Sequence, residues 1–193
     1  MAFPRARLSK PYGAGRRGHY PGPVDDTVDG TLEGAADGTP EGTAEDAAGG
    51  AAEVARRCAE TMYAQDKVAQ DLAMEIVDVA PGRARLRMTV SATMVNGFGI
   101  AHGGYLFLLA DSAFAYACNT HDAVTVAASA DVVFVASARA GDVLEATAVE
   151  RVRYGRSGIY DVTVRRLPDG EVIAEFRGGS RSRDLRVIRG EQP

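Results

Sequence analysis

The spacing of apolar and polar positions changes along the chain, and these changes predict most of its elements. Over residues 54–72 apolar side chains recur every three or four positions with charged residues between them, which predicts an amphipathic helix. Residues 74–79 and 83–91 flank a Pro-Gly turn, and arginine alternates with apolar residues in the second stretch. A period of two with one charged face predicts strands that are covered on a single side.

Apolar and small side chains fill residues 105–118, where Asp111 is the only acidic residue. A helix that is apolar all round is normally buried, and burial of an ionised carboxylate costs several kcal/mol unless it is paired or hydrogen-bonded. Asp111 is therefore a candidate for handling water or a proton in a reaction. The structural alternative is a single polar core residue whose hydrogen bonds are satisfied.

The turn that precedes this helix is rich in glycine, with Gly97, Gly99, Gly103 and Gly104. Glycine allows positive φ angles or close approach to a ligand, and the first N–H groups of a helix have no partner within it. Such N–H groups can polarise a carbonyl and hold a developing oxyanion.

Four stretches with strand character follow that helix, separated by turns, and they span residues 124–137, 143–154, 158–167 and 171–182. The predicted order is helix, two strands, buried helix and four strands. A sheet with one charged face and a single apolar helix to cover predicts an α+β fold in which an antiparallel sheet wraps around that helix.

Length and composition limit the possible functions. A chain of 193 residues that is 46% hydrophobic can bury one sizeable core, so a single domain is predicted. The net charge of −4 does not indicate nucleic-acid binding. No export signal or membrane-spanning run is visible, and we expect a cytoplasmic protein. Three histidines without a second ligand at metal-binding spacing do not indicate a metal site.

The two cysteines, Cys58 and Cys118, lie in apolar helical patterns, so we interpret them as reduced, structural thiols. A nucleophilic Cys118 is the alternative, but no adjacent histidine supports it.

The N-terminal part of the chain differs in composition from the rest. Residues 1–23 are basic with many glycines and prolines, and residues 24–53 carry acidic residues but no lysine or arginine. So little apolar surface cannot offset the entropy of ordering. We therefore expect a disordered extension over 1–53, one folded domain over 54–187 and a flexible tail over 188–193.

With these elements placed, the chain resembles the hotdog-fold acyl-CoA thioesterases, most closely the phenylacetic-acid-degradation (PaaI-like) type, from about residue 62 to 183. The resemblance rests on the motifs NGFGIAHGG, LADSAFAYACN, AASADVVFVASARAGD, GIYDVTV and EFRGGSRS. It implies the hotdog fold, in which an antiparallel sheet wraps around a central apolar helix.

The resemblance also implies roles for five residues. The N–H of Gly103, the first glycine of HGG, would polarise the thioester carbonyl, and Asp111 would act as base or nucleophile. Asn96 would place the substrate or water, and His102 would orient the turn. Ser129, on the strand after the helix, would assist the attacking water. The alternatives are that His102 bonds only its own backbone at the helix start and that Ser129 is an ordinary strand serine.

The implied activity is hydrolysis of acyl-CoA thioesters without a metal or redox cofactor. The acyl group would be aryl-acyl, such as phenylacetyl or hydroxyphenylacetyl in phenylacetate degradation, or medium-chain. Two alternatives stay open: a hydratase or dehydratase acting on acyl thioesters, and a non-catalytic acyl-CoA-binding domain. Neither a membrane nor a nucleic acid is implied as a partner.

Helix geometry predicts that the active unit is at least a homodimer. Eight residues separate Gly103 from Asp111, and on one helix they would lie about 12 Å apart. One thioester cannot reach both, whereas two antiparallel helices related by a twofold axis can bring Gly103 of one subunit beside Asp111 of the other. The resemblance further implies that two such dimers form a homotetramer.

Overall fold

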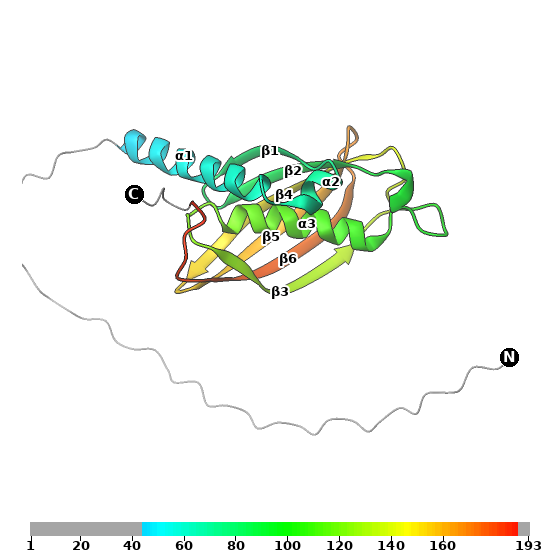
Figure 1. Cartoon of the computed structure of the whole chain (residues 1–193). Helices are drawn as coiled ribbons and strands as arrows, with labels where there is room; N and C mark the ends of the chain where they lie inside the picture. Colours follow the sequence, from blue (N-terminus) through cyan, green and yellow to red (C-terminus); the bar gives the residue numbers. More distant parts are fainter. Residues whose placement is uncertain (1–43, 189–193) are drawn as a thin grey trace, which may run out of the picture. The chain divides into compact units, whose positions relative to one another are not determined.

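The computed structural model describes residues 44–188, which form a six-stranded antiparallel sheet and one long helix against it (Figure 1). The strands lie in the order β1-β2-β4-β5-β6-β3, so β1 and β3 are the edges. The elements are α1 (Ala44–Tyr63), α2 (Lys67–Asp71), β1 (Glu75–Ala80), β2 (Arg83–Thr89), a 3-10 turn (Ala92–Met94), α3 (Gly103–Cys118), β3 (Thr125–Phe134), β4 (Val143–Tyr154), β5 (Ser157–Leu167) and β6 (Val172–Ser182).

Helix α3 lies along the concave face of the sheet and contacts all six strands (Figure 1). Leu109 and Ala113 on its sheet-facing side are completely buried. Phe114 packs edge-on against Tyr160 with ring centroids 5.5 Å apart, and a Cβ at position 178 would lie 2.8 Å from its ring. Glycine at 178 therefore lets the helix approach the sheet. The predicted α+β fold with a sheet around one apolar helix is confirmed.

Strand β2 shows why the arginine alternation predicted a sheet with one covered face. Ala84, Leu86 and Met88 are buried beneath α3. The arginines between them point to the other face, where Arg87 donates to Glu145 on β4 over 2.8 Å. Because successive side chains of a strand alternate between faces, the period of two in the sequence determined which residues enter the core.

Helix α1 begins ten residues earlier than predicted, at Ala44 rather than at Val54. The predicted disordered extension over 1–53 is therefore wrong for residues 44–53, and residues 1–43 lie outside the described part. Five of residues 44–53 are alanine, which has the highest helix propensity, and Arg56 forms ion pairs with Glu53 and Glu60 on the same helix. Helix propensity outweighed the lack of apolar surface there.

The single helix predicted over 54–72 is divided into α1 and α2. Asp66 caps the N-terminus of α2, since its carboxylate accepts from the amide of Ala69 over 3.0 Å. A side chain that satisfies an otherwise free helix-start amide favours a new helix over continuation of the old one.

The predicted flexible tail began at residue 188. The amide of Ile188 donates to Asp122 over 2.8 Å, so this first residue of the tail is held, while 189–193 lie outside the described residues.

No helix within residues 44–188 has the length and apolar content needed to cross a membrane.

We expect that a chain beginning at Val54 keeps its fold. The side chains of residues 47–53 are exposed, so their loss should shift the thermal midpoint by no more than about 3 °C. Deletion through Ala59 also removes Ala55 and Cys58, which are buried, and should lower the midpoint by at least about 6 °C. Thermal unfolding of the two truncated chains beside the full chain measures this, and equal midpoints for both truncations would contradict the prediction.

Candidate active site

The turn before α3 is held by its own backbone. A bridge joins Val95 to Ala101, and the amide of Asn96 donates to the carbonyl of Ile100 over 2.8 Å. The side-chain Oδ1 of Asn96 accepts from the amide of Phe98 over 2.9 Å. Gly99 has a φ of +73°, a conformation that favours glycine. This turn delivers the chain to the start of α3 in one defined direction.

His102 is the N-cap of α3. Its Nδ1 accepts from the amide of Gly104 over 3.0 Å, so this nitrogen carries no proton in that arrangement. Its own amide donates to the carbonyl of Met94 over 2.8 Å. Among the described residues the next amide, that of Gly103, has no acceptor. The first helical N–H is thus free to bind a carbonyl oxygen.

Gly103 lines a cavity of about 390 Å³. The cavity is lined by Asn96, Ile100, Ala101, Gly103, Leu106 and residues 134–137. A Cβ at position 103 would lie 3.0 Å from the ring of Phe134, so glycine is what lets this ring cover the helix start. The cavity lining therefore combines apolar side chains with the polar residues Asn96 and Ser137 and with Gly103 at the helix start.

Asp111 lies two turns further along α3 and is half-buried. Its carboxylate has no hydrogen bond or ion pair with any residue in the described range 44–188. Burial raises the pKa of Asp111 above its ordinary value, because a low-dielectric environment disfavours the charged form. Among residues 44–188, Asp111 therefore lacks the partners that a satisfied polar core residue would have.

Within one subunit the structure keeps Asp111 away from the Gly103 cavity. Asp111 does not line that cavity, and eight residues of helix correspond to about 12 Å along the axis. Asp111 follows Phe107 by one helical turn, and Phe107 packs edge-on against Phe176 of β6 with centroids 5.5 Å apart. Asp111 is therefore on the flank of α3 toward the β6 and β3 side of the sheet.

Ser129 is not brought to Asp111. It pairs with Gly179 on β6, and a Cβ at 179 would overlap the Ser129 hydroxyl. The neighbouring Gly178 faces Phe114 of α3, and successive strand residues face opposite sides. The Ser129 side chain therefore lies on the outer face of the sheet. A bulge between Ala127 and Ser129 shifts the alternation that the sequence alone would give.

The two cysteines are structural, as predicted. Both Cys58 and Cys118 are buried and free. Burial raises the pKa of Cys118 to about 12, so almost no thiolate exists at neutral pH, and the alternative of a Cys118 nucleophile is not supported.

The cavity wall that faces Gly103 was not predicted from the sequence. Phe134 and Val135 are apolar yet 52% and 55% exposed, and both line the cavity. Both residues lie inside the predicted strand 124–137, and a strand end and a cavity wall have the same local pattern of apolar residues.

We expect Asn96→Ala to lower turnover of an acyl-CoA thioester about tenfold to a hundredfold, because the turn loses one bond and the cavity loses one polar group. Ser129→Ala should change turnover less than about threefold, since the hydroxyl lies on the other face of the sheet. Steady-state kinetics of both variants tests this. A larger loss of turnover in the Ser129 variant than in the Asn96 variant would show that Ser129 and not Asn96 contributes to the site.

Comparisons with known proteins identify the family of this chain. Residues 98–173 match the family described as Thioesterase superfamily. The chain is 41% identical over 122 residues to acyl-coenzyme A thioesterase PaaI of Escherichia coli K12, covering 63% of this chain and 86% of the relative. It is 43% identical over 111 residues to a putative esterase of Deinococcus radiodurans, covering 57% of this chain and 75% of that relative.

Comparison with solved structures indicates the same family. The structure of the E. coli PaaI protein from the phenylacetic acid degradation operon superposes with a TM-score of 0.69 at 38% identity, covering 70% of this chain and 97% of that one. The family match includes the whole of α3 with Asp111 and the strands β3, β4 and β5. This chain therefore belongs to the thioesterase superfamily, in its hotdog-fold, PaaI-like branch.

Proposed function

We propose that the protein hydrolyses acyl-CoA thioesters to a free acid and coenzyme A. The observation that carries this proposal is that one helix presents two groups without a partner among residues 44–188. They are the amide of Gly103 at the helix start and the partly desolvated carboxylate of Asp111 two turns later. The first suits a developing oxyanion and the second suits water activation. The E. coli relative is named as an acyl-coenzyme A thioesterase, which supports the same reaction.

In the proposed reaction, water adds to the thioester carbonyl carbon while Asp111 accepts its proton. The carbonyl oxygen becomes an oxyanion, which accepts a hydrogen bond from the Gly103 N–H. The carbon–sulfur bond then breaks, and the departing coenzyme A thiolate takes up the proton. The raised pKa of Asp111 makes its carboxylate a stronger base than an exposed aspartate.

The cavity wall favours an apolar acyl group. Ile100, Leu106, Phe134 and Val135 line it, and its volume of about 390 Å³ is within the range of small-ligand sites. We propose an aryl-acyl group, such as phenylacetyl, or a medium-chain acyl group. His102 contributes by capping the helix and thereby aiming the Gly103 amide.

We propose a homodimer as the smallest active unit, with Gly103 and Asp111 of one site supplied by different subunits. Strand β3 supports this, because in the described part of the chain it pairs only with β6 and no strand covers its other edge. Along or just beyond this strand Val126, Val133, Phe134 and Val135 are 38–58% exposed. A long, apolar, exposed edge strand invites pairing with another strand, and β3 against its symmetry copy would bring the two α3 helices side by side.

We propose further that two dimers associate into a homotetramer through the outer face of the sheet. That face has a groove of about 730 Å³ in which Val133 and Val149 lie among charged side chains. Arg165 and Glu175 both line it, so the face carries both charges and can complement a copy of itself.

The proposed reaction needs no metal or redox cofactor, because the carboxylate activates water and the helix amide stabilises the oxyanion. Turnover should persist after treatment with a chelator. We propose a cytoplasmic location, where acyl-CoA is available.

The test is an assay of thiol release from a panel of aryl-acyl-CoA and straight-chain acyl-CoA substrates, using a chromogenic thiol reagent. Hydrolysis releases one thiol per substrate and is lost in Asp111→Asn. A hydratase would consume the double bond of an enoyl-CoA without releasing thiol, and a binding domain would show saturable binding without turnover. Either of those two results would overturn the proposed function.

A further inference from the structure

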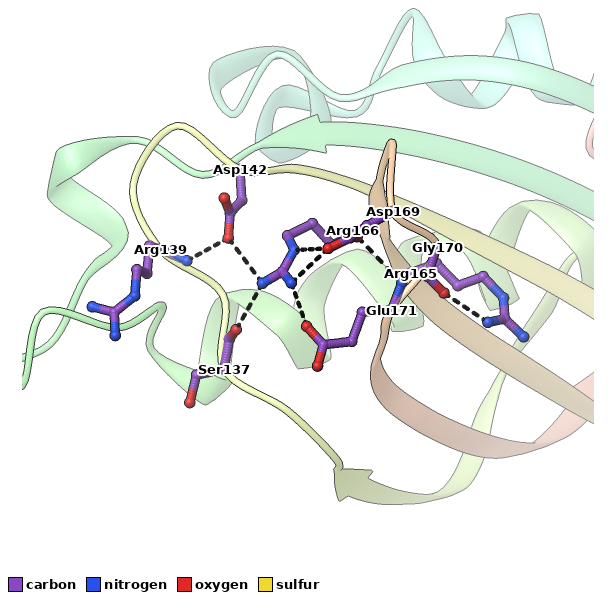
Figure 2. Close-up of polar contacts among 8 residues, drawn as sticks. All are labelled: Ser137, Arg139, Asp142, Arg165, Arg166, Asp169, Gly170 and Glu171. Carbon is purple, nitrogen blue, oxygen red and sulfur yellow. Dashed lines mark hydrogen bonds and ion pairs between the residues drawn. The ribbon is translucent and has the colours of Figure 1, made fainter.

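Arg166 of β5 is the centre of a polar cluster at the end of the sheet (Figure 2). Its Nε and Nη2 donate to Asp169 over 3.0 and 2.7 Å, and Nη2 also donates to Glu171. Both acids belong to the short connection between β5 and β6. Only 24% of the Arg166 side chain is exposed, so the cluster is partly shielded from water.

The other side of the guanidinium reaches the connection between β3 and β4. Nη1 is 3.4 Å from the carbonyl oxygen of Ser137 and 3.7 Å from Oδ2 of Asp142. That same Asp142 oxygen accepts from the backbone amide of Arg139 over 2.8 Å. Figure 2 shows Arg166 between the two connections, with the Arg139 guanidinium turned away from it.

The connection that Arg166 holds is also the wall of the candidate active site. Residues 135–137 line the cavity beside Gly103. The next residue, Ala138, is buried, and its carbonyl accepts from the amide of Ala101 over 2.8 Å. Ala101 precedes Gly103 by two residues, so the same loop supports both the wall and the turn that aims the free amide.

We propose that Arg166 is a positioning residue of the acyl-CoA site. Its guanidinium fixes the loop 135–142 against the β5–β6 connection, and so holds the cavity wall opposite Gly103 in its binding-competent position. The inference rests on the proposed function of that cavity. Arg166 does not line the cavity, and it acts only through the loop.

Arginine suits this task because its planar fork carries five N–H donors in a fixed geometry. Four acceptors from two chain segments lie around it. The ion pairs raise the pKa of Arg166, which stays charged at any pH at which the protein works. A lysine has one ammonium group and cannot span both connections at once.

Loss of the guanidinium should weaken substrate binding more than it slows chemistry. A loop that holds its binding position only part of the time lowers apparent affinity by that fraction, whereas saturating substrate restores the bound state. For Arg166→Gln we expect a KM increase of about fivefold to twentyfold and a kcat within about twofold of the natural chain.

Arg177→Gln is the matched control. Arg177 also lies on a central strand and donates twice to one carboxylate, Asp161, over 2.6 and 2.9 Å. It has no bond to the loop 135–142 within the described residues. We expect its KM to equal that of the natural chain. If Arg166→Gln does not fold, Arg166→Lys keeps a charge beside Asp169 but loses the reach to Ser137, and provides the same test.

Hydrogen exchange measured on the full chain gives a readout that does not need turnover. The Ala101 amide, which donates a hydrogen bond to the carbonyl of Ala138, should exchange faster in Arg166→Gln than in the natural chain. Its exchange rate should be unchanged in Arg177→Gln. An unchanged KM together with unchanged exchange at Ala101 would overturn the inference, as would equal effects in the control. Faster exchange at Ala101 in a protein that releases no thiol from any acyl-CoA would overturn the proposed function and support the role of Arg166 in holding the loop.

Discussion

Replacing Asp111 by asparagine should lower thioester turnover by about a hundredfold to ten-thousandfold, the usual contribution of a general base. Asparagine has nearly the same shape but cannot accept the proton of the attacking water. Because Asp111 has no partner among the described residues, no existing bond is lost, and the fold should be retained. Steady-state kinetics and circular dichroism of the variant measure both effects, and near-normal turnover would remove Asp111 from the mechanism.

The same substitution should stabilise the protein at neutral pH. Burial raises the pKa of Asp111 in the folded chain, so the ionised form disfavours folding above that pKa, and this penalty disappears as pH falls below the unfolded pKa of about 4. The gain in thermal midpoint of Asp111→Asn should therefore be present at pH 7 and absent near pH 3.

Asp161→Asn is the control with the opposite sign. The hydrogen bonds from Arg177 lower the pKa of Asp161, so its ionised form contributes stability above the unfolded pKa, and this contribution is lost as pH falls through the lowered folded value. The Asp161 variant should be less stable than the natural chain at neutral pH, and its stability should approach that of the natural chain in acid. Thermal midpoints of both variants, measured from pH 3 to 8, should show a gain in stability for Asp111→Asn and a loss for Asp161→Asn at neutral pH. A loss of stability in Asp111→Asn at neutral pH would show that the carboxylate of Asp111 is paired.

Mixing two inactive variants should restore activity if the site is shared between subunits. Asp111→Asn removes the base, and Gly103→Val places a branched side chain against the ring of Phe134, where a single Cβ would already be 3.0 Å from it. A mixed dimer has one site with both natural residues and one site with neither. Random exchange of equal amounts should therefore recover about a quarter of the natural activity.

The exchange itself has to be shown, so the mixed dimers are measured by native mass spectrometry with one variant isotopically labelled. Asp111→Asn mixed with itself, labelled and unlabelled, serves as the control and should stay inactive. No recovery in a population that contains mixed dimers, or full activity in a monomer, would contradict the shared site.

The sequence by itself determined the parts of this fold that depend on short-range periodicity. The alternation of arginine with Ala84, Leu86 and Met88 placed β2 and its buried face correctly, because a strand has a fixed period of two. The uninterrupted apolar run around Asp111 identified the central helix. The glycine turn with His102 located the helix start that carries the free amide, because capping depends on residues adjacent in sequence.

Tertiary structure alone decided which of those residues meet. One bulge turned Ser129 to the outer face, since a single extra residue reverses every side chain that follows. The wall beside Gly103 comes from residues 134–137, and Arg166 holds that wall from 29 residues away in sequence. Such contacts depend on how strands order themselves in the sheet, and no local pattern along the chain contains that information.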